Sequence, residues 1–120
     1  MHNLIYLLED DESLAEGLSV ILCDEGYEVK RFATGLEFKK CMQKTLPNMI
    51  ILDYRLPDED GISITKKLKN RPSTKHLPVM LISASQVNLK DKAKEVFAEA
   101  YLVKPFAISD FLFTIKRLVQ

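Results

Sequence analysis

The chain has 120 residues, of which 47% are hydrophobic and 28% are charged, and these values predict one globular domain over residues 1–120 rather than two. Its 17 basic and 17 acidic residues cancel, which argues against direct nucleic-acid binding, and no apolar run is long enough to cross a membrane. The two cysteines, Cys23 and Cys41, lack the spacing of a metal or redox motif, so we expect packing residues in a cytoplasmic domain.

The first predicted strand covers residues 4–8, a short and uniformly apolar run that is typical of a strand buried on both faces. Acidic residues follow it directly. Apolar residues then recur with helical spacing as far as Gly26, which is placed to end the helix in a left-handed conformation. Asp11 is one candidate for the N-terminal cap of this helix. Ser13, with Glu16 in a capping box, is the other.

The next elements lead to the centre of the chain. Residues 27–32 alternate between apolar and polar side chains, which indicates an edge strand with one face in water. Thr34 and Gly35 begin a weaker helix. Residues 49–52 form a second uniformly apolar run, and it continues directly into Asp53 and a turn rich in proline, aspartate and glycine. We expect a buried strand that delivers Asp53 at its carboxyl end.

A third helix begins near Gly61 and is expected to bury Ile64 and Leu68. Its lysines at positions 66, 67 and 69 are predicted to form a solvent-exposed face. Residues 77–82 are a third apolar run, and Ser83 follows it.

The last three elements complete the pattern. A polar helix over residues 89–99 is expected to direct Val96 and Phe97 inward, and a short strand follows at residues 100–103. The final helix, over residues 108–119, has the clearest helical period of the chain. Five strands therefore alternate with five helices. This pattern predicts an α/β fold, a flavodoxin-like doubly wound (βα)5 domain whose five parallel strands have the order 2-1-3-4-5.

Parallel strands end at the same edge of a sheet, so residues far apart in sequence are expected to meet there. These residues are Glu9, Asp10, Asp53, Ser83 and Lys104. Three neighbouring carboxylates repel one another unless a cation joins them, and their oxygen ligands suit Mg²⁺. With Mg²⁺ and Lys104 to offset phosphoryl charge, Asp53 is placed to attack a phosphoryl group. The simpler alternative is that Asp53 only opens the turn, and that Glu9 and Asp10 only favour a helix N-terminus.

Five short motifs occur in order along the chain. They are Glu9-Asp10, Asp53 with Leu56-Pro57, Asp60-Gly61, Pro78-Val79 leading to Ser83-Ala84, and Tyr101-x-x-Lys104-Pro105-Phe106. Together they resemble the receiver domain of two-component response regulators over essentially all 120 residues. The resemblance implies that Asp53 is phosphorylated by a sensor histidine kinase or a phosphotransfer protein. It also implies that Mg²⁺ is held by Glu9, Asp10, Asp53 and the carbonyl group of Arg55.

The same resemblance implies how a signal leaves the domain. Ser83 would contact a phosphoryl oxygen, Lys104 would pair with the phosphoryl group, and the rotamer of Tyr101 would follow the switch. The changed surface would comprise the fourth helix, the fifth strand and the fifth helix, and would serve a homodimer or an effector domain. The resemblance predicts a signalling domain rather than an enzyme, although it assists its own phosphorylation and dephosphorylation.

The sequence departs from the family pattern at two places, and its residues also bear on three other functions. The glycine that usually precedes the last strand is missing, and serine stands at position 83 where threonine is more frequent. A pseudo-receiver would lack one of the site acids or Lys104, yet all of them are present, the acids being Glu9, Asp10 and Asp53. A phosphatase or mutase with an aspartyl intermediate would have a second acid where Arg55 stands, and a flavodoxin would have a phosphate loop after the first strand.

Overall fold

The computed structural model describes residues 3–84 and 88–119. Five parallel strands form one sheet in the order β2-β1-β3-β4-β5, which confirms the predicted topology. The strands are β1 (Leu4–Leu8), β2 (Glu28–Phe32), β3 (Met49–Asp53), β4 (Val79–Ser83) and β5 (Ala100–Val103). The helices are α1 (Glu12–Asp24), α2 (Gly35–Met42), α3 (Gly61–Lys69), α4 (Leu89–Glu95) and α5 (Ile108–Leu118).

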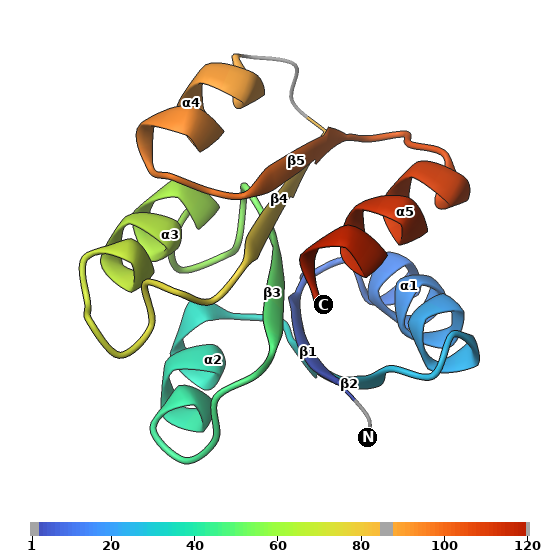
Figure 1. Ribbon diagram of the computed structural model, residues 1–120, viewed down its shortest axis with the longest axis horizontal. Helices are drawn as coiled ribbons and strands as arrows, with labels where there is room; N and C mark the ends of the chain where they lie inside the picture. The colour runs from blue at the N-terminus through green and yellow to red at the C-terminus, as the bar shows by residue number, and fades with distance from the viewer. Residues whose placement is uncertain (1–2, 85–87, 120) are drawn as a thin grey trace.

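The helices cover both faces of the sheet. Figure 1 shows α1 and α5 on one side and α2, α3 and α4 on the other, and each group packs on its own cluster of buried side chains. Alternation along β1 explains this division, because Ile5 joins one cluster and its neighbour Tyr6 joins the other. Strands β3 and β4 are buried along their whole length. Apart from Asp53 and Ser83 at their carboxyl ends, their residues are all apolar, which follows from burial on both faces.

The first helix settles the choice between two N-terminal caps. The Asp11 side chain accepts a hydrogen bond of 3.1 Å from the backbone N–H of Leu14, so Asp11 is the cap. Ser13 lies inside the first turn and is exposed, which makes the capping-box alternative wrong. Gly26 has φ +94° just beyond the helix end, as predicted for a residue that ends a helix in the left-handed region.

The fourth helix ends in a left-handed residue that is not a glycine. The predicted span to residue 99 is too long, because α4 ends at Glu95 and Phe97 takes the left-handed conformation with φ +63°. The N–H of Phe97 donates to the carbonyl of Lys94 at 3.2 Å, and the N–H of Ala98 donates to that of Ala93 at 2.9 Å. These two bonds form a Schellman motif with phenylalanine in the position that glycine usually takes. The Phe97 side chain is 74% exposed, so its predicted inward placement is wrong.

The two cysteines differ in their surroundings. Cys41 is half-buried, and its Sγ lies 3.3 Å from the hydroxyl oxygen of Tyr6, as expected for a packing residue. Cys23 is exposed, and the expectation of packing is wrong there. The reason is helical phase, because Cys23 follows the buried Leu22 and is turned about 100° away from it.

Lys69 corrects the prediction that all the lysines of α3 face solvent. Lys66 and Lys67 are exposed, but the side chain of Lys69 is only 6% exposed. Its Nζ lies 2.7 Å from Glu99, and it also donates to the carbonyl oxygens of Lys75 and Leu77. These contacts tie the end of α3 to the segment before β4 and to the residue before β5, which holds the two strands in position.

We expect Lys69→Met to lower the free energy of unfolding by about 1 to 2 kcal/mol, because two carbonyl groups and one carboxylate lose their donor while the apolar stem remains. Urea denaturation followed by circular dichroism measures this loss. Lys66→Met is the matched control, since Lys66 is exposed on the same helix. Equal unfolding midpoints for the two variants would contradict the structural role of Lys69.

Candidate functional site

The carboxyl ends of the strands bring the predicted site residues together. Glu9 follows β1, Asp53 ends β3, Ser83 ends β4 and Lys104 follows β5. With Asp10 and Arg55 these residues line one cleft of about 470 Å³. The grouping follows from the topology, because every strand of a parallel sheet ends at the same edge.

Lys104 connects two of the acids. Its Nζ lies 2.7 Å from Glu9 Oε1 and 2.7 Å from Asp53 Oδ2, and its peptide bond to Pro105 is cis. Burial alone would lower the pKa of Lys104, but the hydrogen bonds to Asp53 and Glu9 outweigh burial and raise it above its ordinary value. The ammonium group therefore stays charged, and it neutralises carboxylates that would otherwise repel each other.

Glu9 has the most perturbed carboxyl group of the cleft. It is 3% exposed, and this burial raises its pKa from 4.5 to about 7. Hydrogen bonds from Lys104 and from the N–H of Asp11, the latter 3.1 Å from Oε2, lower the pKa but do not reverse the shift. The neighbouring carboxylate of Asp53 raises it further. Glu9 consequently gains or loses a proton near neutral pH.

This shift makes stability depend on pH. Between pH 4.5 and about 7 the folded protein holds a proton on Glu9 that the unfolded chain has released, so the free energy of unfolding decreases as pH rises through this window. We expect a decrease of about 2 to 3 kcal/mol in magnesium-free buffer, measured by urea denaturation at a series of pH values. Glu9→Gln should remove most of this slope and the exposed Glu16→Gln should not. An unchanged slope in Glu9→Gln would contradict the assignment.

Asp53 is held by the backbone around it. Its Oδ1 accepts a hydrogen bond of 3.1 Å from the N–H of Arg55, while Oδ2 faces Lys104. After the loop, the chain comes back to the end of β3 at Gly61, whose N–H donates to the carbonyl of Tyr54 at 2.6 Å. A Cβ atom at Gly61 would lie 2.5 Å from the carbonyl oxygen of Asp53. Only glycine allows this approach without moving the end of β3.

The three acids form a group that can accept a metal ion. One ligand oxygen from each of Glu9, Asp10 and Asp53 lies within 4.8 Å of the others. Asp10 is exposed while Glu9 and Asp53 are buried, so the group opens toward solvent on one side. Its donors are all carboxylate oxygens, which Mg²⁺ prefers and which soft metals do not. The donor set therefore fits Mg²⁺.

Two further predicted residues lie in different surroundings. Ser83 is 1% exposed and lines the cleft beside the acids. Tyr101 is 39% exposed and lines a separate hollow with Lys94, Thr114 and Arg117. The structure thus brings every predicted phosphoryl and metal residue into one cleft, and it leaves Tyr101 outside that cleft on β5.

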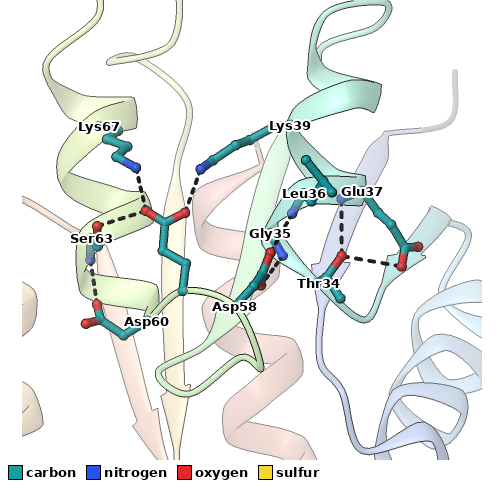
Figure 2. A network of polar contacts seen from close by, with 10 residues as sticks. Thr34, Gly35, Leu36, Glu37, Lys39, Asp58, Asp60, Ser63 and Lys67 are labelled. Atoms are coloured by element: carbon teal, nitrogen blue, oxygen red, sulfur yellow. Dashed lines mark hydrogen bonds and ion pairs between the residues drawn. The ribbon is translucent and has the colours of Figure 1, made fainter.

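The loop after Asp53 contains polar contacts that sequence reasoning missed. Asp58 caps α2, since its two carboxylate oxygens accept hydrogen bonds from the N–H groups of Gly35 and Leu36 at 2.8 and 3.0 Å. These bonds hold the pKa of Asp58 below its ordinary value, and the bond from Gly35 has the largest effect. Figure 2 shows this cap beside the local Thr34 cap of the same helix. No sequence motif reports a cap that comes from 22 or 23 residues away.

Across residues 3–84 and 88–119, the structure contains no helix that is both long enough and apolar enough to span a membrane.

Comparisons of the sequence and of the structure with known proteins all point to one family. The family model of the response regulator receiver domain matches residues 5–116. The phosphate regulon transcriptional regulatory protein PhoB of Rhizobium meliloti is 32% identical over 117 residues, which cover 97% of this chain and 52% of that protein. The chain spans about half the length of the transcriptional regulators that it matches.

Solved structures are similar along nearly the whole chain. A crystal structure from Chloroflexus aurantiacus, assigned as a response regulator, has a TM-score of 0.93 and 32% identity and covers 99% of this chain and 98% of its own. The receiver domain of the sensor histidine kinase PA1611 of Pseudomonas aeruginosa has a TM-score of 0.88 and 22% identity, with coverage of 99% and 98%. That crystal structure holds a magnesium ion in its active-site cleft.

Proposed function

Because the chain belongs to the response regulator receiver domain family and is thus a signalling domain of a two-component system rather than a classical enzyme, we propose that Asp53 is its phosphoacceptor. The donor is the phosphohistidine of a sensor histidine kinase or a phosphotransfer protein. The observation that carries this proposal is the 2.7 Å contact of Lys104 with both Asp53 and Glu9 in an open cleft. A nucleophile beside a fixed ammonium group is suited to phosphoryl transfer.

The transfer needs few protein groups. An Asp53 carboxylate oxygen attacks the phosphorus atom, the bond between phosphorus and the histidine nitrogen breaks, and an aspartyl phosphate forms. Lys104 offsets the charge on the phosphoryl oxygens. Ser83 ends the neighbouring strand in the same cleft, and we assign its hydroxyl group to a phosphoryl oxygen.

We assign Mg²⁺ to Glu9, Asp10, Asp53 and the carbonyl group of Arg55. Support comes from the three acids within 4.8 Å and from the magnesium-bound receiver of similar fold. When bound, Mg²⁺ offsets phosphoryl charge during transfer. Glu9 accepts a hydrogen bond from the N–H of Asp11, which orients its carboxyl group toward the cleft, and Arg55 is positioned by its own N–H bond to Asp53.

The proposal is tested by intact mass measurement after incubation with acetyl phosphate or phosphoramidate. One phosphoryl group should be added in the presence of Mg²⁺, and much less after EDTA treatment. Hydroxylamine should release it, since acyl phosphates are labile to this reagent. A chain that stays unmodified by both donors and by a purified histidine kinase would be a pseudo-receiver, and the proposal would fail.

We propose that the signal leaves through α4, β5 and α5. Helix α4 buries only Leu89 and Ala93, so it can shift at low cost. It is also connected to the site, because Lys92 donates a hydrogen bond to the hydroxyl group of Tyr54, the residue after Asp53. A phosphoryl group that draws Ser83 toward it favours a second arrangement of this face, with Tyr101 turned inward.

Ser83→Ala tests this route. The variant should still accept the phosphoryl group on Asp53, but the chemical-shift changes in residues 89–118 on phosphorylation should be several-fold smaller than in the wild type. Heteronuclear NMR of both proteins with phosphoramidate measures this, and Ser13→Ala, at an exposed position of α1 outside this window, is the control. Changes concentrated in residues 27–45, with 89–118 untouched, would rule out this output face.

Receiver domains interact with histidine kinases, and some form dimers when activated. For this chain we propose that the surface of α4, β5 and α5 binds a second copy or an effector domain, and that the domain itself contacts neither nucleic acid nor membrane. We also propose that residues 1–120 form one receiver unit that acts in the cytoplasm. Its cysteines are free, which suits a reducing compartment.

A further inference from the structure

A groove of about 530 Å³ lies between α2 and α3, away from the phosphoryl cleft. We call it the α2–α3 groove. Its floor is apolar and includes Phe38, Met42, Leu46, Ile64 and Leu68. Phe38, Ile64 and Leu68 belong to the buried core, and Met42 is partly buried against it, whereas Leu46 is 44% exposed. The core therefore continues outward into a hollow that stays open to solvent.

The rim of the groove is basic. Lys39 and Lys44 border it from α2 and the segment after it, and Lys67 and Arg71 border it from α3 and the turn beyond. None of its lining residues, all of which the structure describes, is acidic. Within the described part of the chain, Lys44 and Arg71 have no ion-pair partner. The chain is neutral as a whole, so this concentration of cations is local.

One carboxylate outside the lining, that of Glu59 in the loop between β3 and α3, joins two of the rim lysines. Glu59 lies 2.6 Å from the Nζ of Lys39 and 2.6 Å from that of Lys67, and Figure 2 shows these two lysines pointing toward one another from α2 and α3. Burial would raise the pKa of Glu59, but the hydrogen bonds from Lys39, Lys67 and Ser63 hold it at about 2. An ionised carboxylate thus already lies between these two lysines, so the rim can pair with carboxylate groups.

These features together select one kind of ligand. An apolar floor between two helices accepts the apolar face of a third helix, which inserts side chains spaced i, i+3, i+4 and i+7. A basic rim then favours acidic residues beside that apolar face. A nucleic-acid backbone would pair with the cations but would leave the floor uncovered.

We propose that the α2–α3 groove is a docking site for an acidic amphipathic helix of a partner protein. The helix packs its apolar face on Met42 and Leu46, above the buried Phe38 and Leu68, and its carboxylates pair with Lys44 and Arg71. At the loop end they compete with Glu59 for its two lysines. This site is separate from Asp53 and from the face of α4, β5 and α5, so it holds whether or not Asp53 is phosphorylated.

The experiment uses the full chain labelled with ¹⁵N and a synthetic helical peptide with leucine at the apolar positions and glutamate beside them. Titration should shift the amide signals of residues 38–46 and 64–74 more than those of the rest of the chain. Lys44→Glu with Arg71→Glu should weaken binding about tenfold or more. Lys90→Glu with Lys94→Glu, the same charge change on exposed residues of α4, should leave it unchanged. Glu59→Gln should tighten binding, because it removes the competing carboxylate.

Three results would overturn the proposal. The first is the absence of groove shifts even at millimolar peptide, while circular dichroism shows that protein and peptide are folded. The second is equal binding of a peptide in which lysine replaces glutamate, or of one in which serine replaces leucine, since either removes one half of the recognition. The third is binding of the groove to phosphatidylglycerol vesicles but not to the acidic peptide, which would identify a membrane surface as the occupant.

Discussion

Asp53→Asn should abolish the addition of a phosphoryl group from acetyl phosphate, phosphoramidate or a histidine kinase. The amide oxygen of asparagine is a much weaker nucleophile than a carboxylate oxygen, so no acyl phosphate forms. The variant should still fold, because the amide oxygen can accept the N–H of Arg55 that now bonds to Oδ1. Intact mass spectrometry over the same incubation time measures the loss, which we expect to be complete within detection.

Asp91→Asn is the matched control for this substitution, since Asp91 is exposed in the first turn of α4 and lies outside the cleft. It should be modified as fast as the wild type. If the Asp53→Asn protein were still phosphorylated, the phosphoacceptor would be a residue other than Asp53. A phosphate on either protein that resists hydroxylamine would indicate a serine or threonine ester and would also contradict Asp53 as the acceptor.

Lys104→Met should tighten Mg²⁺ binding by about tenfold to a hundredfold. In the metal-free protein the ammonium group already neutralises Glu9 and Asp53 at 2.7 Å, so an incoming cation meets reduced attraction and a like charge nearby. A positive charge at this range is worth a few kcal/mol at the effective dielectric constant of a protein, and tenfold corresponds to about 1.4 kcal/mol. Isothermal titration calorimetry measures the affinity directly.

The same variant should lose phosphoryl transfer, since the charge that offsets the phosphoryl oxygens is removed. Tighter metal binding combined with slower transfer is a pattern that general unfolding would not give. Lys90→Met, at an exposed position of α4, should change neither quantity. Unchanged Mg²⁺ affinity in Lys104→Met would mean that the metal does not bind among Glu9, Asp10 and Asp53.

The fold and the membership of the cleft could be read from local sequence because two general rules act on it. Uniformly apolar runs end directly at Glu9, Asp53 and Ser83, and strands buried on both faces must be apolar along their length. Right-handed crossovers then fix the strand order and place every strand end at one edge. These rules need only the order of residues along the chain.

Where the sequence was misleading, helical phase or a helix end decided the outcome. Phe97 fits the apolar pattern of a longer helix, yet the backbone turns left-handed there and the side chain is exposed. Cys23 is a residue type that is usually buried, but it lies on the outer side of α1. The end of α4 depends on where the chain must turn to enter β5, and the sequence of the helix alone does not specify that position.

Only the tertiary structure decided the electrostatics. Burial of Glu9 beside Asp53 and Lys104 sets its pKa near neutrality, and these three residues come from distant parts of the chain. Lys69 can be buried because Glu99 lies 2.7 Å from its Nζ, and the groove between α2 and α3 forms only where residues of both helices are brought together. Desolvation and pairing depend on neighbours brought together by folding, so a residue pattern that predicts where a side chain lies does not predict its charge or its partner.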